Sequence, residues 1–440
     1  MKRTIALLLS CALCLSVFAG CTANEAPTET NALVPTEKVK DYSQYKGIVA
    51  DPKGWYEELM SLPIANNDMT EDELRQLCVD AFRLNLSFQW TPNEDLAFGF
   101  TILDRTNEVM LNKGIAYSGL FYNNNTCQGH AYKVLDFYDP ETGALDIEAM
   151  GGYKMNIMGS ACAMGITWAW TRVCNTSYPV DTVNMHQYAS GTVPVGPYNY
   201  PPAKYSFSPG DGTLQLIADN GLQTMYESYA ATKPADGVYS SSAYHVMMIS
   251  KNPEVVRWPD GSIDPANSYT YVNEQAAGGT LTEKYNYIQS NGVTLRPLGT
   301  VDRKVSFEEL ATKGYIPFAL KELLKQEPIE PGETWIGKGN TRLENGQDIT
   351  LSEMLASYKL SANYAIVTFE FQVKDQNGNL LYEYDPRFNT NSRTYDIQLN
   401  NLDIVEQFRP YANGKNTLHI NTRLSNGEFL EAFNTLLKVQ

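Results

Sequence analysis

The segment GSACAMGITWAWTRVC, from Gly159 to Cys174, restricts the possible folds of this chain more than any other part of the sequence. Apolar residues such as Ile166 and Trp170 recur at helical spacing, so the segment is predicted to be a helix packed into a core by its apolar face. With Ser160 as the N-cap, Cys162 is the second helical residue, where free backbone N–H groups and the helix dipole favour a thiolate. The same pattern also fits a buried structural cysteine, and the helix alone leaves both interpretations open.

The first residues of the chain indicate export. A basic start, Met1-Lys2-Arg3, is followed by an apolar stretch to Phe18 that is too short to span a membrane. The residues FAGC, which end at Cys21, resemble the lipobox of bacterial lipoproteins, in which cleavage leaves a lipid-modified cysteine at the new N-terminus. This resemblance implies a signal peptide over residues 1–20, lipid on Cys21 and a location on the extracellular face of the bacterial cytoplasmic membrane. The alternative is an ordinary signal peptide cleaved near Ala19.

The composition after the signal restricts the partners. Residues 21–46 are rich in Thr, Pro, Glu, Ala and Asn and poor in large apolar residues, so they are predicted to form a flexible tether. The 440-residue chain has a formal net charge of −16, and loss of Lys2 and Arg3 with the signal peptide makes it −18. Such an acidic protein is not expected to bind nucleic acid or to attach electrostatically to anionic lipid. No later segment is long and apolar enough to span a bilayer.

Cysteine usage gives no sign of a disulfide framework or of a metal site. Of the seven cysteines, four fall in the predicted globular part: Cys78, Cys127, Cys162 and Cys174. This number is too small for the framework of a small secreted domain, although one or two bridges are possible, with Cys127 and Cys174 the first pair to consider. There is no CxxC pair, no His/Cys cluster at metal-ligand spacing, no HExxH motif and no GxGxxG motif after a strand. The sequence therefore predicts no metal and no nucleotide cofactor.

The region before the Cys162 helix, residues 47–149, is predicted to be mainly helical. Its clearest element is MTEDELRQLCVDAFRLNLSF, where Thr70 as N-cap and Glu73 three residues later form a capping-box pattern. Apolar residues then recur at helical spacing and put Cys78 on the buried face. Cys78 is therefore interpreted as structural.

Three further parts follow this region. Residues 150–299 are predicted to form the domain that contains the Cys162 helix, residues 300–330 a helical bridge, and residues 331–440 a β-sandwich of immunoglobulin-like kind. In the last part, alternation predicts that five residues share one strand face: Ala365, Val367, Phe369, Phe371 and Val373. The dipeptides Asn377-Gly378 and Asn426-Gly427 are typical of hairpin turns.

A thiolate nucleophile needs a base within hydrogen-bond reach, and the base needs a partner that orients it. The chain has four histidines: His130, His186, His245 and His419. His245 begins the predicted strand HVMMIS, from which its side chain can project into a cleft. The next predicted strand, SYTYVNEQ, supplies Glu274 as the orienting residue. Asn273 and Gln275 are the alternatives, and alternation along a strand places them on the face opposite Glu274.

A cysteine at a helix start, a strand that begins His-Val and a strand that ends Glu-Gln together resemble the CHAP-type amidohydrolase/peptidase domains and the related NlpC-type cell-wall peptidases. The resemblance covers about residues 150–279 and implies an α+β, papain-like fold, in which the cysteine helix packs on an antiparallel sheet that carries the histidine. It also implies that Cys162 attacks an amide carbonyl of a peptidoglycan peptide, that His245 is the base and that Glu274 orients it. The chain departs from the family in having Cys-Ala-Met-Gly for the usual Cys-Ser-Gly and Ala276 where some relatives have an assisting asparagine.

Three functional interpretations follow. The first is a membrane-tethered cysteine amidase or peptidase that acts on cell-wall peptides through a thioester acyl-enzyme. The second is the same fold without activity, serving as a binding or scaffolding lipoprotein at the cell surface. The third is a transglutaminase-like enzyme, in which an amine takes the place of water. The reactivity of Cys162 separates the first from the second, and amine incorporation identifies the third.

Overall fold

The structure, a computed structural model, describes residues 48–102, 105–125, 128–175, 191–199, 205–281, 287–325, 327–385, 394–396 and 404–439. Helices and several sheets occur together in this part of the chain, so it belongs to the α+β class, as predicted. The predicted signal peptide, the predicted lipid site Cys21 and the predicted tether lie outside the described residues.

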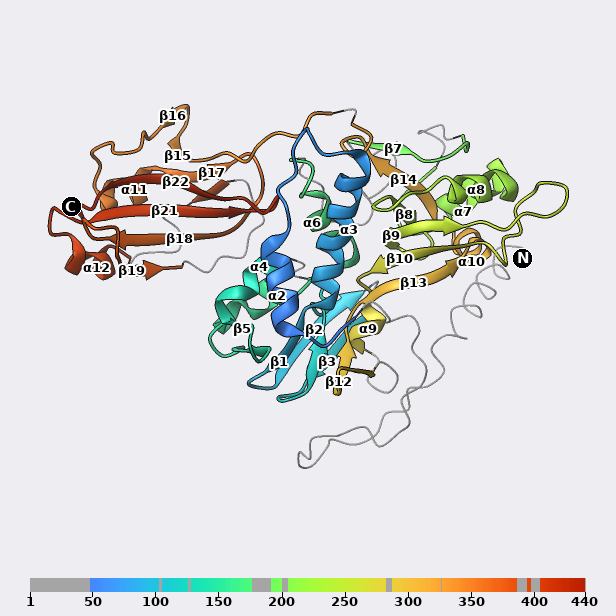
Figure 1. Ribbon diagram of the computed structural model, residues 1–440, viewed down its shortest axis with the longest axis horizontal. Coiled ribbons are helices and arrows are strands. Elements are labelled where there is room, and N and C mark those ends of the chain that lie inside the picture. The colour runs from blue at the N-terminus through green and yellow to red at the C-terminus, as the bar shows by residue number, and fades with distance from the viewer. Residues whose placement is uncertain are drawn as a thin grey trace, which may run out of the picture. The chain divides into compact units, whose positions relative to one another are not determined.

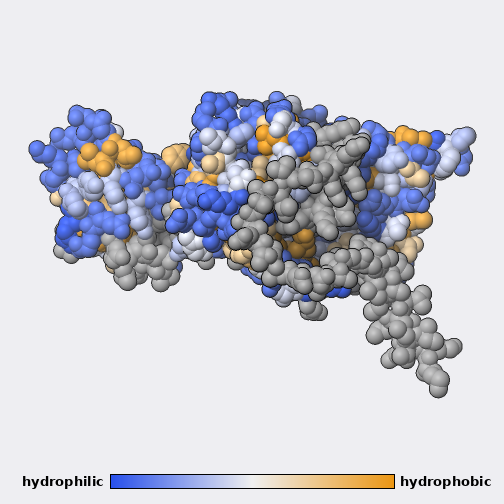
Figure 2. All heavy atoms as spheres, turned by 90° about the horizontal axis from the view of Figure 1, so that it is seen from below, coloured by the Kyte–Doolittle hydropathy of each residue, from blue (hydrophilic) through white to orange (hydrophobic). Residues whose placement is uncertain are grey.

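The surface of the described part is mainly polar. On the face shown in Figure 2, most of the described surface is hydrophilic and the apolar residues form small, separate groups. Within the described residues, no helix combines the length and the apolar composition needed to cross a bilayer. Most large apolar side chains are instead buried in four cores.

Two helices open the described chain, α2 (Pro52–Ser61) and α3 (Glu71–Ser87). The predicted capping box is present at the start of α3, because Thr70 Oγ1 accepts a hydrogen bond from Glu73 N and the Glu73 carboxylate accepts one from Thr70 N. Cys78 is fully buried in this helix, as predicted.

Strands follow α3, so the prediction of a mainly helical region 47–149 is wrong for residues 89–118, although short helices occur between residues 131 and 158. A six-stranded sheet has the order β11-β12-β4-β1-β6-β5, and β2 and β3 form a separate hairpin. The strands are β1 (Gln89–Pro92), β2 (Leu96–Ile102), β3 (Arg105–Leu111), β4 (Ala116–Ser118), β5 (Tyr138–Asp139), β6 (Ala144–Leu145), β11 (Ile288–Ser290) and β12 (Val293–Pro297). Most strands of the sheet have two to four residues, which is too short for alternation to be recognised.

The first sheet also crosses the predicted boundary at residue 149, because β11 and β12 come from residues 288–297 and β12 pairs with β4. Short helices join the elements of this part: α4 (Ala131–Val134), η2 (Leu135–Phe137), η3 (Gly151–Tyr153), α5 (Lys154–Met158) and α9 (Ala277–Leu281). The N-terminal region and the predicted domain 150–299 are therefore interleaved.

A second six-stranded sheet, with the order β13-β10-β9-β8-β14-β7, is antiparallel throughout. Its strands are β7 (Thr192–Pro194), β8 (Gly237–Ser240), β9 (His245–Glu254), β10 (Tyr269–Glu274), β13 (Thr300–Ser306) and β14 (Ile316–Leu320). Helix α6 (Cys162–Trp170) packs on β9, and α3 packs on α6 (Figure 1). The predicted strands HVMMIS and SYTYVNEQ are thus neighbours in one sheet, beside the cysteine helix.

Helices cover both faces of this second sheet. Val246 and Met248 of β9 are buried in one core with Ile166 of α6. Met247 and Ile249 belong to a different core, because side chains alternate between the two faces of a strand. That second core includes residues from α7 (Gly212–Asn220), α8 (Leu222–Ala230) and α10 (Phe307–Thr312).

The prediction of a helical bridge over residues 300–330 is wrong, because β13 and β14 of the second sheet come from it and only α10 between them is helical. Strand β14, with the sequence IPFAL, is buried at every position. Its apolar residues therefore run without interruption and do not show the alternation that distinguishes a strand from a buried helix. The sheet continues to Leu320, beyond the predicted domain end at residue 299.

The C-terminal part has two four-stranded sheets, β16-β15-β17-β20 and β19-β18-β21-β22. Its elements are β15 (Thr334–Lys338), β16 (Thr341–Arg342), α11 (Leu351–Ser357), β17 (Lys359–Ala362), β18 (Ile366–Lys374), β19 (Leu380–Tyr384), β20 (Thr394–Asp396), α12 (Ile404–Phe408), η7 (Arg409–Tyr411), β21 (Thr417–Leu424) and β22 (Phe429–Leu436). Ile336 and Leu360 from one sheet share a core with Phe371 and Ile420 from the other.

The alternation predicted for β18 holds over most of the strand. Phe369, Phe371 and Val373 are buried in the core between the two C-terminal sheets, whereas Val367 is buried in the core of the N-terminal region. The register between β18 and β21 shifts around Val367, and a bulge of this kind turns a side chain to the other face. The predicted turns at Asn377-Gly378 and Asn426-Gly427 do connect strands, and both glycines have a positive φ.

The close packing of α6 on α3 leads to a test. A Cβ added to Gly165 in α6 would lie 2.5 Å from Cε2 of the buried Phe82 in α3. We expect Gly165→Ala to lower the free energy of unfolding by about 1–3 kcal/mol, as overpacking of a core does, in urea denaturation. Gly278→Ala in α9 has open space around the added Cβ and is the control, with no loss expected. Equal stability of both variants would contradict this packing.

Candidate active site

Cys162 is the first residue of α6, and only 3 % of its surface is exposed. The N-cap is Ala161, which has extended dihedral angles and makes no side-chain cap, so the prediction of Ser160 as N-cap is wrong. Ser160 is instead part of an extended segment beside Tyr122: its N–H donates to Phe121 O at 3.0 Å, and its carbonyl accepts from Asn123 N at 2.9 Å. This pairing fixes the chain just before the cysteine.

The whole of α6 is buried, on every side, rather than by one apolar face as predicted. Trp168 and Trp170 pack in the core, and Trp170 Nε1 donates a hydrogen bond to Ala235 O at 2.9 Å. Because α6 is enclosed by α3 and β9, the position of its first residue is set by packing. The burial of α6 also fits a structural cysteine, and it fixes the position of the Cys162 thiol.

His245 is the first residue of β9 and follows a tight turn after β8. Tyr244, immediately before it, has a φ of 48°, in a region that non-glycine residues rarely adopt. The turn is anchored by its serines, because Ser240 Oγ and Ser242 Oγ donate to Lys313 O at 2.6 and 2.9 Å. The strained backbone of Tyr244, next to His245, is therefore maintained by the contacts of these serines.

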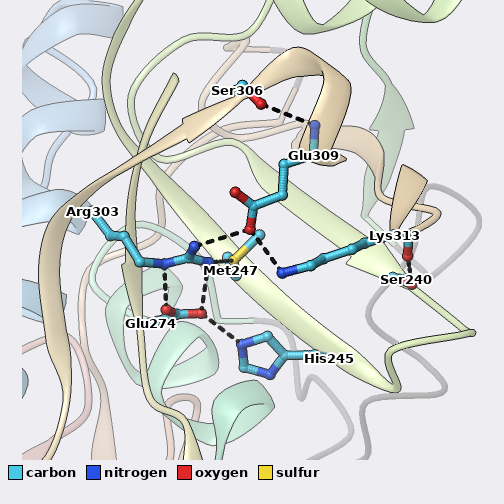
Figure 3. A network of polar contacts seen from close by, with 8 residues as sticks. All are labelled: Ser240, His245, Met247, Glu274, Arg303, Ser306, Glu309 and Lys313. Carbon is cyan, nitrogen blue, oxygen red and sulfur yellow. Dashed lines mark hydrogen bonds and ion pairs between the residues drawn. The ribbon is translucent and has the colours of Figure 1, made fainter. Parts of the chain in front are cut away.

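Glu274 is the last residue of β10. Because β9 and β10 are antiparallel, it lies at the same end of the strand pair as His245, the first residue of β9. His245 Nε2 lies 3.1 Å from Glu274 Oε2, and Figure 3 shows the two side chains pointing toward each other. The His245 side chain also hydrogen-bonds with the side chain of Cys162. The structure therefore brings all three predicted residues together.

Arg303 is a fourth member of this cluster, which sequence reasoning missed. Its Nε lies 2.6 Å from Glu274 Oε1, and its Nη2 donates to Glu274 Oε2 at 3.3 Å (Figure 3). Arg303 is opposite Val272 in the pairing of β13 with β10, close to the end where Glu274 lies. This neighbour relation depends on the register of β13 against β10, which no local pattern in the sequence indicates.

The pKa values follow from burial and from these contacts. Burial by itself lowers the pKa of His245, but the hydrogen bonds and charges of Cys162 and Glu274 outweigh burial and raise it to about 10. Burial raises the pKa of Glu274, whereas Arg303 and His245 lower it more strongly, to about 2. At neutral pH the cluster therefore contains an imidazolium beside an ionised carboxylate, and a positively charged ring favours a thiolate at Cys162.

The alternative orienting residues, Asn273 and Gln275, have structural roles. Gln275 Nε2 donates to Leu120 O at 3.0 Å and to Leu298 O at 3.3 Å, which links the second sheet to the first. Asn273 Oδ1 accepts from Asp302 N at 3.0 Å. Both side chains are buried, and neither makes a hydrogen bond to His245 in the contacts of the described residues.

Two other histidines are described, and both have local partners. His130 is the N-cap of α4, where its Nδ1 accepts from Tyr132 N at 3.1 Å, and burial lowers its pKa well below the usual value. His419 lies in β21, with Nδ1 2.5 Å from Glu431 Oε2. His186 lies outside the described residues.

The remaining described cysteines, Cys78 and Cys174, are buried. Burial raises the pKa of the Cys78 thiol to about 12, and the Cys174 thiol lies 3.3 Å from Trp170 O. Cys127 lies outside the described residues, so the bridge considered for Cys127 and Cys174 stays a prediction. In the described part of the chain, no three His, Cys, Asp or Glu side chains gather in a way that would bind a metal ion.

The pKa of Glu274 predicts a specific pH dependence of stability. A folded pKa of about 2, against the usual 4.5, stabilises the folded state above pH 4.5, and this stabilisation is lost as the pH falls toward 2. Between pH 6 and pH 3 the loss is about 2 kcal/mol of unfolding free energy, and Glu274→Gln should abolish it. Urea unfolding at the two pH values measures the difference. Glu108→Gln, which removes an exposed carboxylate of β3, is the control with a wild-type dependence; the same dependence in Glu274→Gln would contradict the assignment.

No protein-family model matches this chain, and no curated protein and no solved structure matches it. The geometry of the cluster formed by Cys162, His245, Glu274 and Arg303 is therefore the basis for assigning a function.

Proposed function

We propose that the chain is a cysteine-dependent hydrolase of amide bonds with a papain-like core, in which Cys162 is the nucleophile, His245 the acid and base, and Glu274 the orienting residue. The observation that carries the proposal is the side-chain contact between Cys162, at the start of a buried helix, and His245, whose Nε2 lies 3.1 Å from Glu274 Oε2. A thiol, an imidazole and a carboxylate in this order are what thiol-dependent acyl transfer requires.

The chemistry starts from a thiolate at Cys162 and an imidazolium at His245. The sulfur attacks the carbonyl carbon of the amide, a C–S bond forms, and the carbonyl oxygen becomes an oxyanion. His245 donates a ring proton to the amide nitrogen, the C–N bond breaks and the amine leaves. A thioester with Cys162 remains. Water then attacks the thioester carbonyl, and His245 accepts a proton from the water. The C–S bond breaks, the carboxylic acid product leaves, and Cys162 returns to the thiolate.

The helix start gives the oxyanion an electrostatic partner. The first N–H groups of a helix point out of its N-terminal end and carry the positive end of the helix dipole. Cys162 is the first residue of α6, so its own backbone N–H lies at this end, next to the sulfur that attacks. Charge that develops on the substrate oxygen is stabilised there, in a buried environment that strengthens the interaction.

The proposed substrate class is a peptide of the bacterial cell wall, and the proposed location is the outer face of the cytoplasmic membrane. The location rests on the lipobox-like residues that end at Cys21 and on the tether composition of residues 21–46. The substrate class rests on the resemblance of the Cys162, His245 and Glu274 segments to CHAP-type and NlpC-type domains. The two C-terminal sheets are proposed to be an immunoglobulin-like accessory module of this enzyme.

Thiol alkylation tests the proposal. At pH 7 we expect iodoacetamide to label Cys162 at least tenfold faster than Cys78, and His245→Ala to slow the labelling of Cys162 at least tenfold. Peptide mapping of the labelled full chain separates the cysteines. His419→Ala is the matched control, because it removes another histidine paired with a carboxylate, and it should leave the rate unchanged.

The outcomes separate the functional interpretations. Slow labelling of Cys162 that does not depend on His245 would overturn the proposal and leave a binding or scaffolding lipoprotein. Fast, His245-dependent labelling supports it, and incubation with cell-wall peptides and a primary amine then distinguishes release of a free acid from formation of a new amide. A new amide as the main product would identify an acyl transferase in place of a hydrolase.

A further inference from the structure

The polar contacts of His245 and Glu274 continue beyond the three proposed catalytic residues. Arg303 Nη1 lies 3.2 Å from Glu309 Oε1, and Lys313 Nζ donates to the same oxygen at 2.8 Å (Figure 3). Charges thus alternate in sign along the series from His245 through Glu274, Arg303 and Glu309 to Lys313. The last three residues of this series come from one continuous segment, formed by β13, α10 and the residue after α10.

The same segment also supports the turn that leads to His245. The carbonyl oxygen of Lys313 accepts hydrogen bonds from Ser240 Oγ and Ser242 Oγ, at 2.6 and 2.9 Å. Lys313 therefore contacts the histidine turn through its main chain and the charge series through its side chain. The contacts thus run from His245 through Lys313 to Ser240, the two residues that flank the turn (Figure 3).

We propose that Arg303 is a positioning residue for the proposed Cys162–His245 pair, acting by fixing the Glu274 carboxylate against His245, and that α10 in turn fixes Arg303. This inference rests on the proposed function. It adds a residue that the resemblance to CHAP-type and NlpC-type domains does not imply.

Burial explains why Glu274 needs such a partner. Its side chain is only 10 % exposed, and that of His245 is 16 % exposed. A buried carboxylate with a single partner is expensive to keep ionised, and it takes up a proton at a higher pH than an exposed one. Arg303 contacts both oxygens of Glu274, so it stabilises the charge and also restricts rotation of the carboxylate.

The orientation of Arg303 is itself fixed from several sides. Glu309 binds Nη1, and Nη2 also contacts Met247 Sδ at 3.3 Å. The Glu309 backbone N–H donates to Ser306 Oγ at 3.0 Å, which caps the start of α10 and so fixes the residue that pairs with Arg303. A lysine at position 303 would provide a charge without this fork of donors.

Charged and titratable groups near Glu274 come from several elements. They are His245 of β9, Arg303 of β13, Cys162 of α6, Glu309 of α10 and Tyr315, which precedes β14. Burial, together with the charges of Glu274 and Cys162, raises the pKa of Tyr315, so this phenol stays neutral in the neutral pH range. Arg303 and His245 are therefore the cations of this group, and loss of Arg303 leaves His245 alone against Glu274.

The effect of removing Arg303 has a defined sign. Without the guanidinium, the pKa of Glu274 rises, so the carboxylate is protonated at a higher pH and no longer stabilises the imidazolium. As the pH falls, the ion pair of Cys162 and His245 is therefore lost at a higher pH than in the wild type. In Arg303→Met, the midpoint of the pH profile for Cys162 alkylation should shift upward by one unit or more, and the alkylation rate at pH 6 should fall about tenfold.

The experiment measures the rate of Cys162 alkylation from pH 4 to pH 10 in the full chain, with neutral iodoacetamide and with anionic iodoacetate. Arg303→Lys should show a smaller upward shift and serves as the test if Arg303→Met does not fold. Arg257→Met is the matched control, because Arg257 pairs with Glu227 at 2.6 Å on the surface of the same part of the chain, and its profile should equal that of the wild type. Thermal unfolding of each variant checks that it is folded.

The outcomes distinguish this inference from the proposed function. Profiles of Arg303→Met and Arg303→Lys that match the wild type, together with a large loss of rate in His245→Ala, would overturn the role of Arg303 and leave the proposed function standing. Slow, His245-independent alkylation in the wild type would overturn both. An upward shift in Arg303→Met, smaller in Arg303→Lys and absent in Arg257→Met, supports the positioning role.

Discussion

A carboxylate buried between an imidazole and a guanidinium is the interaction on which the candidate site depends. Glu274 is nearly enclosed, and it remains ionised only because His245 and Arg303 contact its two oxygens. That negative charge, with the sulfur of Cys162, raises the pKa of His245 in spite of burial. If Glu274 were neutral or turned away, the His245 ring would lose the partner that sets its protonation and its orientation. The ring would then no longer favour a thiolate at Cys162.

The fold brings these groups together by simple means. His245 begins β9 and Glu274 ends β10. In an antiparallel pair the start of one strand and the end of the other lie side by side, so the two residues are at the same end of the strand pair. Helix α6 is buried on all sides between α3 and β9, so its first residue, Cys162, has a fixed position beside that end. Arg303 arrives from β13, which pairs with the other side of β10. The arrangement therefore needs three adjacent strands and one buried helix.

The sequence was sufficient to predict the parts of the site that have a local signature. Cys162, His245 and Glu274 each stand at the end of an element with a clear period, and the structure brings them into contact. The N-cap was wrong because Ser160 is engaged in long-range pairing with the segment at Phe121, which no local pattern reports. Arg303 was not predicted for a similar reason. Its role depends on the register of β13, and the sequence predicts a helical bridge where β13 lies.

The same limit explains the errors in the fold. Strand β14 is buried on both faces and has no alternation, and the strands after α3 are too short to show a period. The long strand β18 was predictable over Phe369, Phe371 and Val373, but the bulge at Val367 depends on packing against another core. Elements with a long, clear period and a local cap were predictable, whereas domain boundaries and register were set by contacts distant in the sequence.

The central claim is that His245 is positively charged because Cys162 and Glu274 surround it. NMR titration of the four histidine rings, with the His245 signal assigned from His245→Ala, measures this charge directly. The account predicts that His245 stays protonated through neutral pH and loses its proton near pH 10, and that its pKa falls in Cys162→Ala. A His245 ring that titrates near 6.5 and is unaffected by Cys162→Ala would contradict the account.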